Sequence, residues 1–253
     1  MASGREFLEQ HRTVLSSADA ERFAARHENF VRELVGRSDP TEDLDAGCRA
    51  TFIAFFSHCQ RQYLALKERE ASEEILRAAD GIRSVESISN RFGRDVYSRI
   101  GDLRHMVEMP NCRNIVMVGC GAFPAALLWL RDHFPEARCT GLDLDSRCVE
   151  RAAHVTSIMG IDNVQFEVVD GSHYVFDGVD FVYVANQVVP KKAVLQQIVR
   201  SSCVSHVVVR EPTRKGELLA EAVRHDLPIE FAVHAQGEES PVFLSYDLIL
   251  RRV

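Results

Sequence analysis

The sequence predicts an α/β protein with a mostly parallel, Rossmann-like sheet that follows an all-helical amino-terminal domain. After residue 111, apolar β-branched runs recur at short intervals with helical patterning between them. That alternation is typical of a parallel sheet covered by helices on both faces. Before residue 111 such runs are almost absent, and apolar residues recur at helical spacing. We therefore expect two domains, over residues 1–108 and 109–253.

The first expected strand, Ile115–Val118, runs into a glycine turn, and the next, Cys139–Leu142, ends at an acid. A tight turn of residues without a Cβ lets the backbone approach a ligand at the strand's carboxyl end. Asp143 stands 22 residues after Gly121, close to the roughly 20 expected of an acid that binds ribose hydroxyls. The stretch therefore predicts a nucleoside site formed by Gly119, Cys120, Gly121, Phe123, Asp143 and Leu144.

The residues around the turn narrow the choice of nucleoside. A dinucleotide fingerprint needs a third glycine where Pro124 stands, and proline instead suits the start of a helix. The lysine and hydroxyl of a triphosphate-binding loop are also missing. S-adenosylmethionine (SAM), which has no phosphates, remains as the candidate nucleoside ligand. Two glycines alone would equally fit a plain strand-to-helix turn, and it is the acid at the right distance that favours a ligand.

Polar residues follow the next three expected strands as well. The strand over 163–169 ends in Asp170-Gly171, where a carboxylate can accept a hydrogen bond from the adenine amino group. The strand over 179–185 ends in Asn186-Gln187, and the strand over 204–209 ends in Arg210-Glu211-Pro212. Carboxyl ends of parallel strands share one edge of a sheet, so the site is expected there.

Composition excludes several classes of function. The 253 residues are 46% hydrophobic with a formal charge of −7, so we expect a globular protein without a nucleic-acid footprint. The pair Lys191-Lys192 is interpreted as a solvated helix start. Neither a signal peptide nor an apolar run of roughly 20 residues is recognisable, which predicts a cytosolic protein that binds no membrane. Seven cysteines without a C-x-x-C pair are read as core residues, and no metal is expected.

The amino-terminal domain is predicted from amphipathic segments. A capping region at 17–21 precedes Phe23, His27, Phe30, Val31 and Leu34 at helical spacing. A second helix is expected from Thr41–Leu44, with an apolar face of Phe52, Phe55 and Phe56. Residues 84–108 offer one or two more helices, interrupted near Gly93 and Gly101. We expect the aromatic residues to form a core. The domain itself would serve as a lid, a substrate-recognition element or a homodimer interface.

After the fifth strand, residues 216–224 are expected to be helical, and 229–234 and 242–250 to be two strands. Two such strands would form an antiparallel edge beside the parallel ones. This arrangement resembles the carboxyl end of the class I SAM-dependent methyltransferase fold, and the resemblance covers roughly residues 111–253.

A closer resemblance is carried by the loop itself. The stretch Val118-Gly119-Cys120-Gly121-Ala122-Phe123-Pro124 resembles the V-G-S-G-P-L-P loop of the nicotianamine synthases. Leu142-Asp143-Leu144-Asp145 resembles their F-D-I-D strand end, and Val207-Val208-Val209-Arg210 their V-V-x-R segment. Those enzymes also carry a helical domain of about this length before the loop.

The resemblance implies chemistry at the γ-carbon of SAM. Nicotianamine synthases direct an amine at the aminocarboxypropyl chain and release methylthioadenosine, whereas related bacterial proteins let the α-amine of SAM attack its own γ-carbon to give azetidine-2-carboxylate. The length of 253 residues favours the second, smaller type. The alternatives are a small-molecule O- or N-methyltransferase and a non-catalytic SAM-binding module. The expected partner is a small-molecule substrate in each enzymatic case.

The resemblance also guides the choice of catalytic residues. Nicotianamine synthases place a glutamate in the last helix before the first strand, where this chain offers Asp102 and Glu108 as the nearest acids. Asn186 and Gln187 would bind the carboxylate or amine of SAM. A tyrosine ring would attract the sulfonium, although most tyrosines near such pockets only pack. The candidate tyrosines are Tyr97, Tyr174 and Tyr183.

Overall fold

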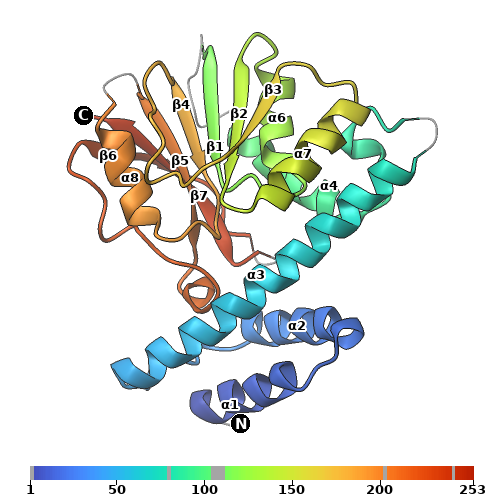
Figure 1. Cartoon of the computed structure of the whole chain (residues 1–253). Helices are drawn as coiled ribbons and strands as arrows, with labels where there is room; N and C mark the ends of the chain where they lie inside the picture. Colours follow the sequence, from blue (N-terminus) through green and yellow to red (C-terminus); the bar gives the residue numbers. More distant parts are fainter. Residues whose placement is uncertain (1–2, 79–80, 104–111, 202–203, 241–242) are drawn as a thin grey trace.

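The computed structural model describes residues 3–78, 81–103, 112–201, 204–240 and 243–253. Its centre is a seven-stranded sheet of order β3-β2-β1-β4-β5-β7-β6 (Figure 1). β1 to β5 run parallel, and β7 pairs antiparallel with both β5 and β6. The predicted fold class and its antiparallel edge are therefore confirmed. The strands are β1 (Asn114–Val118), β2 (Arg138–Asp143), β3 (Val164–Val168), β4 (Phe181–Val184), β5 (His206–Pro212), β6 (Phe231–Gln236) and β7 (Ser245–Arg252).

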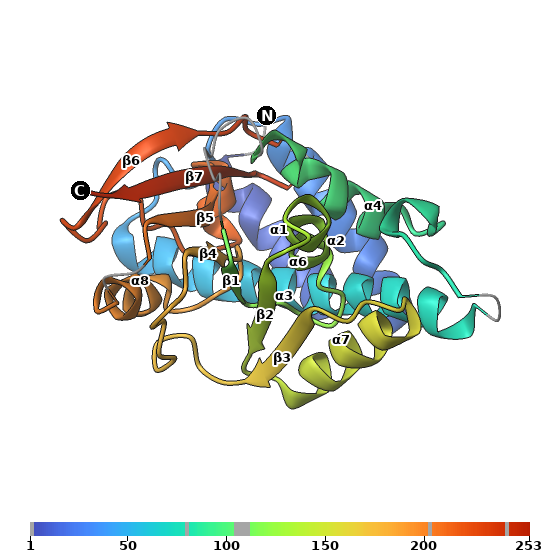
Figure 2. The same ribbon diagram turned by 90° about the horizontal axis from the view of Figure 1, so that it is seen from above.

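Helices cover both faces of the sheet, as Figure 2 shows from above. α6 (Ala125–His133) and α7 (Ser146–Ile158) lie on one face, and α8 (Lys191–Val199) lies on the other. Successive side chains of β1 alternate between two cores, with Ile115 and Met117 packed on the α6 side and Val116 and Val118 on the α8 side. This two-sided burial explains why the central strands β1 and β4 are almost entirely apolar, whereas the edge strand β3 carries Gln165 and Glu167.

The amino-terminal part is helical. It contains α1 (Gly4–Ser16), α2 (Ala20–Val35), α3 (Ala46–Arg77), η1 (Val85–Ser87), α4 (Arg91–Ser98) and η2 (Arg99–Asp102). Ser3, Asp19 and Asp45 cap the first three helices by accepting backbone N–H bonds. Phe30 and Phe56 stack with ring centroids 4.4 Å apart in their shared core, so the aromatic residues pack as predicted.

α3 is the element that joins the two parts. Its 32 residues span about 48 Å at 1.5 Å per residue. In Figure 1 it runs from the small helices α1 and α2 across the lower end of the sheet to α4 and α7. The lower end is where β1, β2 and β4 finish, so α3 passes the carboxyl edge of the parallel strands.

Several predicted boundaries were wrong. α3 begins at Ala46 instead of near Thr41, because the Asp39 carboxylate accepts bonds from the N–H and hydroxyl of Thr41 and turns the chain there. Gly93 does not interrupt α4. A Cβ on Gly93 would lie 2.7 Å from Ile88 and 2.9 Å from Phe123, so the glycine permits close packing.

The segment after β5 also differs from its prediction. It forms only a short 3₁₀ helix, η3 (Lys215–Leu218), followed by turns, where a helix over 216–224 was expected. Backbone N–H groups of Val223 and Arg224 bond to the Glu211 carboxylate instead of to carbonyls of a preceding helical turn. The expected domain boundary at 108/109 and Glu108 lie outside the described residues. No helix in the described ranges is long and apolar enough to cross a membrane.

Candidate active site at the carboxyl edge of the sheet

The glycine turn after β1 has the backbone geometry that its residues predict. Gly119 and Gly121 have φ values of +79° and +66°, in the left-handed region that side chains disfavour. The N–H groups of Gly119 and Cys120 both donate to the carbonyl of Leu142, at 2.8 and 3.0 Å. The loop is therefore fastened to the end of β2 beside it.

Asp143 at the end of β2 organises this loop further. Its Oδ2 accepts from the N–H of Gly121 at 2.9 Å, and its Oδ1 accepts from the N–H of Asp145 at 3.0 Å. Each carboxylate oxygen keeps a second lone pair for a ligand hydroxyl. The predicted ribose acid is thus held in a fixed orientation by backbone amides.

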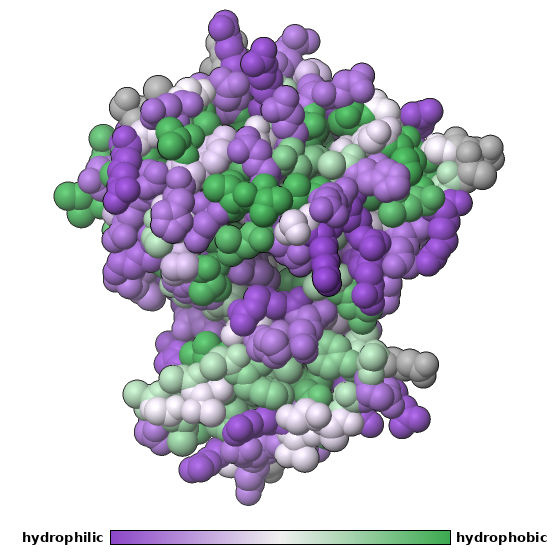
Figure 3. Space-filling view, in the orientation of Figure 1, coloured by the Kyte–Doolittle hydropathy of each residue, from purple (hydrophilic) through white to green (hydrophobic). Residues whose placement is uncertain are grey.

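A cavity of about 450 Å³ opens along the carboxyl ends of β1 to β4. Among its lining residues are Gly119, Gly121, Asp143, Leu144, Asp170, Gly171 and Gln187, so most of the predicted SAM-binding residues meet there. Leu144 and Val189 line it and are 65% and 52% exposed. Figure 3 shows apolar surface on this face of the sheet-bearing part, above the point where the molecule narrows. Such a rim suits the flat face of a nucleobase.

Asp170 lies at the end of this cavity that β3 provides. Its Oδ1 accepts from the N–H and hydroxyl of Ser172, at 2.8 and 2.7 Å. These hydrogen bonds lower the pKa of Asp170 below its ordinary value. The group is a carboxylate at neutral pH and keeps Oδ2 as an acceptor, 3.6 Å from His173.

Glu68 on α3 lines the site and was not predicted from the sequence. Its Oε2 accepts from the N–H of Ala122 at 2.9 Å, and a Cβ on Gly121 would lie only 2.2 Å from that oxygen. Burial, reinforced by the charge of Asp143, raises the pKa of Glu68 to about 8. Only the path of α3 past the glycine loop reveals this acid, since 54 residues separate Glu68 from Ala122.

A smaller inner cavity of about 110 Å³ adjoins the first and shares Glu68, Gly119 and Gln187 with it. Cys120, Phe123 and Asn186 from the prediction line it, together with Tyr183 and Arg99. Through Gln60, Leu64, Phe92 and Phe243 it continues toward an outer cavity of about 640 Å³ between α2, α3 and α4. The arrangement offers a nucleoside-sized space, a smaller inner space and an outer approach.

Of the three candidate tyrosines, only Tyr183 is placed at the inner cavity. Tyr97 is buried between α4 and α6 and donates to Asp132 at 2.7 Å, and the ring of Tyr174 packs on Phe176. Tyr97 belongs to the core on the α6 side and Tyr174 is partly buried against the core on the α8 side, and neither lines the two cavities. Asp102 lies in η2, but its side chain is outside the described part of the chain.

Cys120 is a packed residue of the loop. Its side chain is buried, and burial together with the charges of Asp143 and Glu68 raises the pKa of the thiol well above its ordinary value. A neutral buried thiol is a poor nucleophile. Cys120 therefore shapes the wall of the inner cavity, and a larger residue there would reduce its space.

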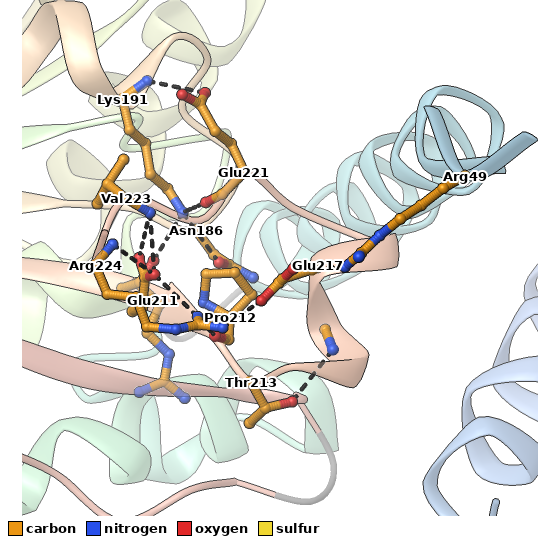
Figure 4. Close-up of polar contacts among 12 residues, drawn as sticks. Arg49, Asn186, Lys191, Glu211, Pro212, Thr213, Glu217, Glu221, Val223 and Arg224 are labelled. Atoms are coloured by element: carbon orange, nitrogen blue, oxygen red, sulfur yellow. Dashed lines mark hydrogen bonds and ion pairs between the residues drawn. The ribbon is translucent and has the colours of Figure 1, made fainter. Parts of the chain in front are cut away.

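Lys191 corrects the expectation of a solvated helix start, because its side chain is fully buried. Its Nζ donates to the carbonyls of Arg210 at 2.9 Å and Glu221 at 2.6 Å, and to Asn186 Oδ1 at 3.4 Å (Figure 4). Burial lowers the pKa of Lys191 to about 8. The lysine ties the turn after β4 to β5 and fixes the oxygen side of the Asn186 carboxamide.

The same polar network continues to the helical part. Glu211 is fully buried and accepts from Arg224 Nη1 at 3.2 Å, and Arg224 also pairs with Glu217. Glu217 in turn pairs with Arg49 at 3.1 Å, and Figure 4 shows Arg49 reaching it from α3. The chain of charges connects the first turns of α3 to the end of β5.

Replacing Lys191 with Met should change the pH dependence of stability. The folded-state pKa of about 8 lies below the ordinary 10.5, so between these values the unfolded chain binds more protons than the folded one. The free energy of unfolding of the wild type therefore increases with rising pH in this window. Lys191→Met should lack that increase. Chemical denaturation at several pH values from 7.5 to 10.5 measures the difference; equal slopes for the two proteins would contradict the buried amine.

Gly121→Ala should disrupt the site at two points. An alanine at φ +66° is strained, by roughly 1–3 kcal/mol. Its Cβ would also lie 2.2 Å from Glu68 Oε2 and would displace the carboxylate. We expect a lower melting temperature and loss of nucleoside binding. Gly178→Ala is the matched control, because Gly178 also has a positive φ of +75° but an open environment. Retained binding in Gly121→Ala would contradict the described loop.

Comparisons with known proteins agree with this architecture. No protein-family model matches the chain, and no curated protein matches it. Among solved structures, a glutamate-to-glutamine variant of MtNAS in complex with S-adenosylmethionine is similar with a TM-score of 0.77 at 15% identity, over 98% of this chain and 97% of that one. MtNAS in complex with MTA and tNA matches with a TM-score of 0.79 at 14% identity, over 100% and 99% of the two chains.

Methyltransferases match over a smaller part. A SAM-dependent methyltransferase from Aquifex aeolicus is similar with a TM-score of 0.50 at 11% identity, over 67% of this chain and 97% of that one. The likeness to MtNAS, by contrast, includes the amino-terminal helices as well as the sheet. The protein thus has the class I SAM-dependent methyltransferase fold, joined to an amino-terminal helical part in the overall architecture of the nicotianamine synthase MtNAS.

Proposed function

We propose that this protein binds SAM and catalyses attack of an amine on the γ-carbon of its aminocarboxypropyl chain, with release of methylthioadenosine. The observation that carries the proposal is the meeting of two cavities at Gly119 and Glu68. The larger cavity has the carboxylates that suit a nucleoside, and the smaller one carries a carboxyl group whose pKa is about 8. SAM bound across both would place its sulfonium near the junction.

Each part of SAM has a matching group. Asp143 would accept the ribose hydroxyls and Asp170 the adenine amino group, while the glycine loop leaves room for the chain beyond the sulfur. Gln187 donates through Nε2 to the Leu219 carbonyl at 3.3 Å, and its buried Oε1 has no partner among the described residues. That oxygen is a ready acceptor for an amine, and Asn186 presents its amide beside it.

Glu68 would act as the general base. The attacking nitrogen forms a bond to the γ-carbon, the carbon–sulfur bond breaks, and its electron pair leaves with sulfur as methylthioadenosine. The nitrogen loses a proton to the Glu68 carboxylate. A base whose pKa is near the working pH is effective in such a transfer, and the positive sulfonium nearby favours the ionised form of Glu68.

The size of the inner cavity favours the α-amine of SAM itself as the nucleophile, which gives azetidine-2-carboxylate. At about 110 Å³ the cavity has room for little beyond the aminocarboxypropyl chain. Intramolecular attack depends mainly on holding the chain bent, and well-oriented intramolecular reactions gain roughly 7–11 kcal/mol from positioning.

A second candidate is transfer of the chain to an external amine. The outer cavity of about 640 Å³ favours it, because it adjoins the inner one and would have room for an acceptor. Its carboxylates Glu28 and Glu70 are both paired with Lys67. With an external amine the same bonds form and break at the γ-carbon, and Glu68 has the same role. Methyl transfer, the remaining alternative, would release S-adenosylhomocysteine instead of methylthioadenosine.

Mass spectrometry of the purified protein incubated with SAM alone tests the proposal. Methylthioadenosine and azetidine-2-carboxylate, formed faster than in a protein-free control, support cyclisation. Methylthioadenosine formed only when amines are added supports transfer to an acceptor. Production of S-adenosylhomocysteine with any acceptor, without methylthioadenosine, would refute both and establish a methyltransferase.

A further inference from the structure

A buried ion pair lies at a further cavity, of about 290 Å³, which Arg99 also lines. Arg210 on β5 and Asp247 on β7 approach to 3.1 Å, and their side chains are 2% and 5% exposed. The other two nitrogens of Arg210 also have partners: Nε donates to Ser245 Oγ at 3.0 Å and Nη2 to the Ser245 carbonyl at 3.1 Å. Each nitrogen of the Arg210 guanidinium therefore has a partner within the protein.

Asp247 is occupied as well. Its Oδ2 pairs with Arg210, and its Oδ1 accepts from the hydroxyl of Tyr183 at 3.2 Å. One carboxylate and one guanidinium cancel in charge, so this pair offers no net negative charge to a third group.

The third group is Arg99 in η2. Its guanidinium lies 4.7 Å from the ring centroid of Phe243, and its Nε is buried without a hydrogen-bond partner in the described part of the chain. Within that part no carboxylate lies within 4.0 Å of Arg99. Burial and the charge of Arg210 lower the pKa of Arg99. Arg99 thus lines the inner cavity without an ion-pair partner in the described residues, while Asp95, Glu238 and Glu239 line the 290 Å³ cavity that it also borders.

We propose that Arg99 binds the α-carboxylate of the aminocarboxypropyl chain of SAM; this inference rests on the proposed function. Arg99 and Glu68 both line the inner cavity of about 110 Å³. A planar guanidinium matches a carboxylate with two parallel hydrogen bonds. With the carboxylate held by Arg99, the α-amine on the same carbon stays within the small space that Glu68 and Gln187 also line.

A carboxylate contact at Arg99 would favour substrate over the nucleoside product. Methylthioadenosine carries no carboxylate, so it cannot use Arg99 and should bind more weakly than SAM. Cleavage of the carbon–sulfur bond separates the nucleoside from the group that Arg99 holds. The enzyme would therefore distinguish ligands with an amino-acid end from those without one.

Isothermal titration calorimetry with S-adenosylhomocysteine and with methylthioadenosine tests the inference on wild type, Arg99→Met and Arg94→Met. Arg94 is an exposed arginine on the neighbouring α4 and is the matched control. We expect Arg99→Met to weaken S-adenosylhomocysteine binding by about 10- to 100-fold, the range of a charge-assisted hydrogen bond. Methylthioadenosine binding should change less than about twofold on the same grounds, since it lacks the carboxylate.

The outcomes separate this inference from the proposed function. If wild type binds both ligands and Arg99→Met leaves their affinity ratio unchanged, the carboxylate role is overturned while SAM binding stands. If wild type binds neither ligand, the proposed function fails and the inference with it. Should Arg99→Met not fold, Arg99→Lys provides the same comparison, because a lysine keeps the charge but loses the paired hydrogen bonds. Decarboxylated S-adenosylhomocysteine is then also titrated into wild type. The inference is overturned if Arg99→Lys leaves the ratio of S-adenosylhomocysteine to methylthioadenosine affinity unchanged and wild type binds the decarboxylated compound as tightly as S-adenosylhomocysteine.

Discussion

Glu68→Gln is expected to lower the turnover of SAM by about 100-fold or more, the contribution of a positioned general base. Glutamine has the size of glutamate but cannot accept a proton from the attacking amine. S-adenosylhomocysteine should still bind, because Asp143, Asp170 and the glycine loop are unchanged. Initial rates of methylthioadenosine formation, with calorimetric affinities for S-adenosylhomocysteine, provide the measurement. Glu73→Gln, on the same helix but paired with Arg77, is the control and should keep full activity.

The pH profile gives a second readout of the same change. The pKa of Glu68 in the free protein is about 8, so kcat/KM should rise with pH up to that region, and Glu68→Gln should lack this limb. The free energy of unfolding of the wild type should instead decrease with rising pH, relative to that of Glu68→Gln. Because the folded pKa lies above the ordinary 4.5, the folded state binds more protons between pH 4.5 and 8, and wild type loses stability relative to Glu68→Gln as pH rises through this window. A variant as active as wild type would exclude Glu68 as the base.

Asp247→Asn is expected to destabilise the fold by about 3–5 kcal/mol, the cost of breaking a buried ion pair by removing one partner. The carboxylate is the counter-charge of Arg210 at 3.1 Å and the acceptor of the Tyr183 hydroxyl. Without it, Arg210 and Arg99 would be two buried cations close together. Chemical denaturation at pH 7 measures the free energy of unfolding.

The double variant Arg210→Met with Asp247→Leu separates charge from packing. It removes the pair together and leaves apolar side chains of similar size, so much of the stability lost in Asp247→Asn should return. If the double variant is less stable than Asp247→Asn, the loss comes from packing or from the Ser245 hydrogen bonds of Arg210 and not from an unpaired charge.

The features predicted well from sequence are those that depend on neighbouring residues. The apolar runs predict the central strands because β1 and β4 bury both faces, and the turn from β1 needs residues that accept φ values of +79° and +66°. Asp143 is the last residue of β2 and Asp170 follows the end of β3 by two residues, so the parallel pairing of these strands brings both to one edge. The helix start at Asp19 follows the same local logic. The start expected at Thr41–Leu44 was wrong, because Asp39 turns the chain there and α3 begins only after Asp45.

What failed depends on contacts between distant segments. Tyr97 and Tyr174 were chosen by residue type, but the side of the helix or loop on which each ring lies was decided by Asp132 and Phe176. Lys191 was read as solvated because lysines seldom lie buried. Carbonyls of Arg210 and Glu221, which meet only after β5 and the following turn have folded, provide its acceptors.

The sequence by itself determined the strands, the glycine loop and the carboxylates of the nucleoside site, because each follows from local geometry and burial. Only the tertiary structure decided which groups face the chain of SAM in the proposed function. Glu68, Arg99 and Tyr183 come from α3, η2 and β4 and meet at one cavity. Their pKa values and their free hydrogen-bonding atoms depend on which residues lie next to them in the folded protein. Residues far apart along the chain carry no local pattern from which that proximity can be predicted.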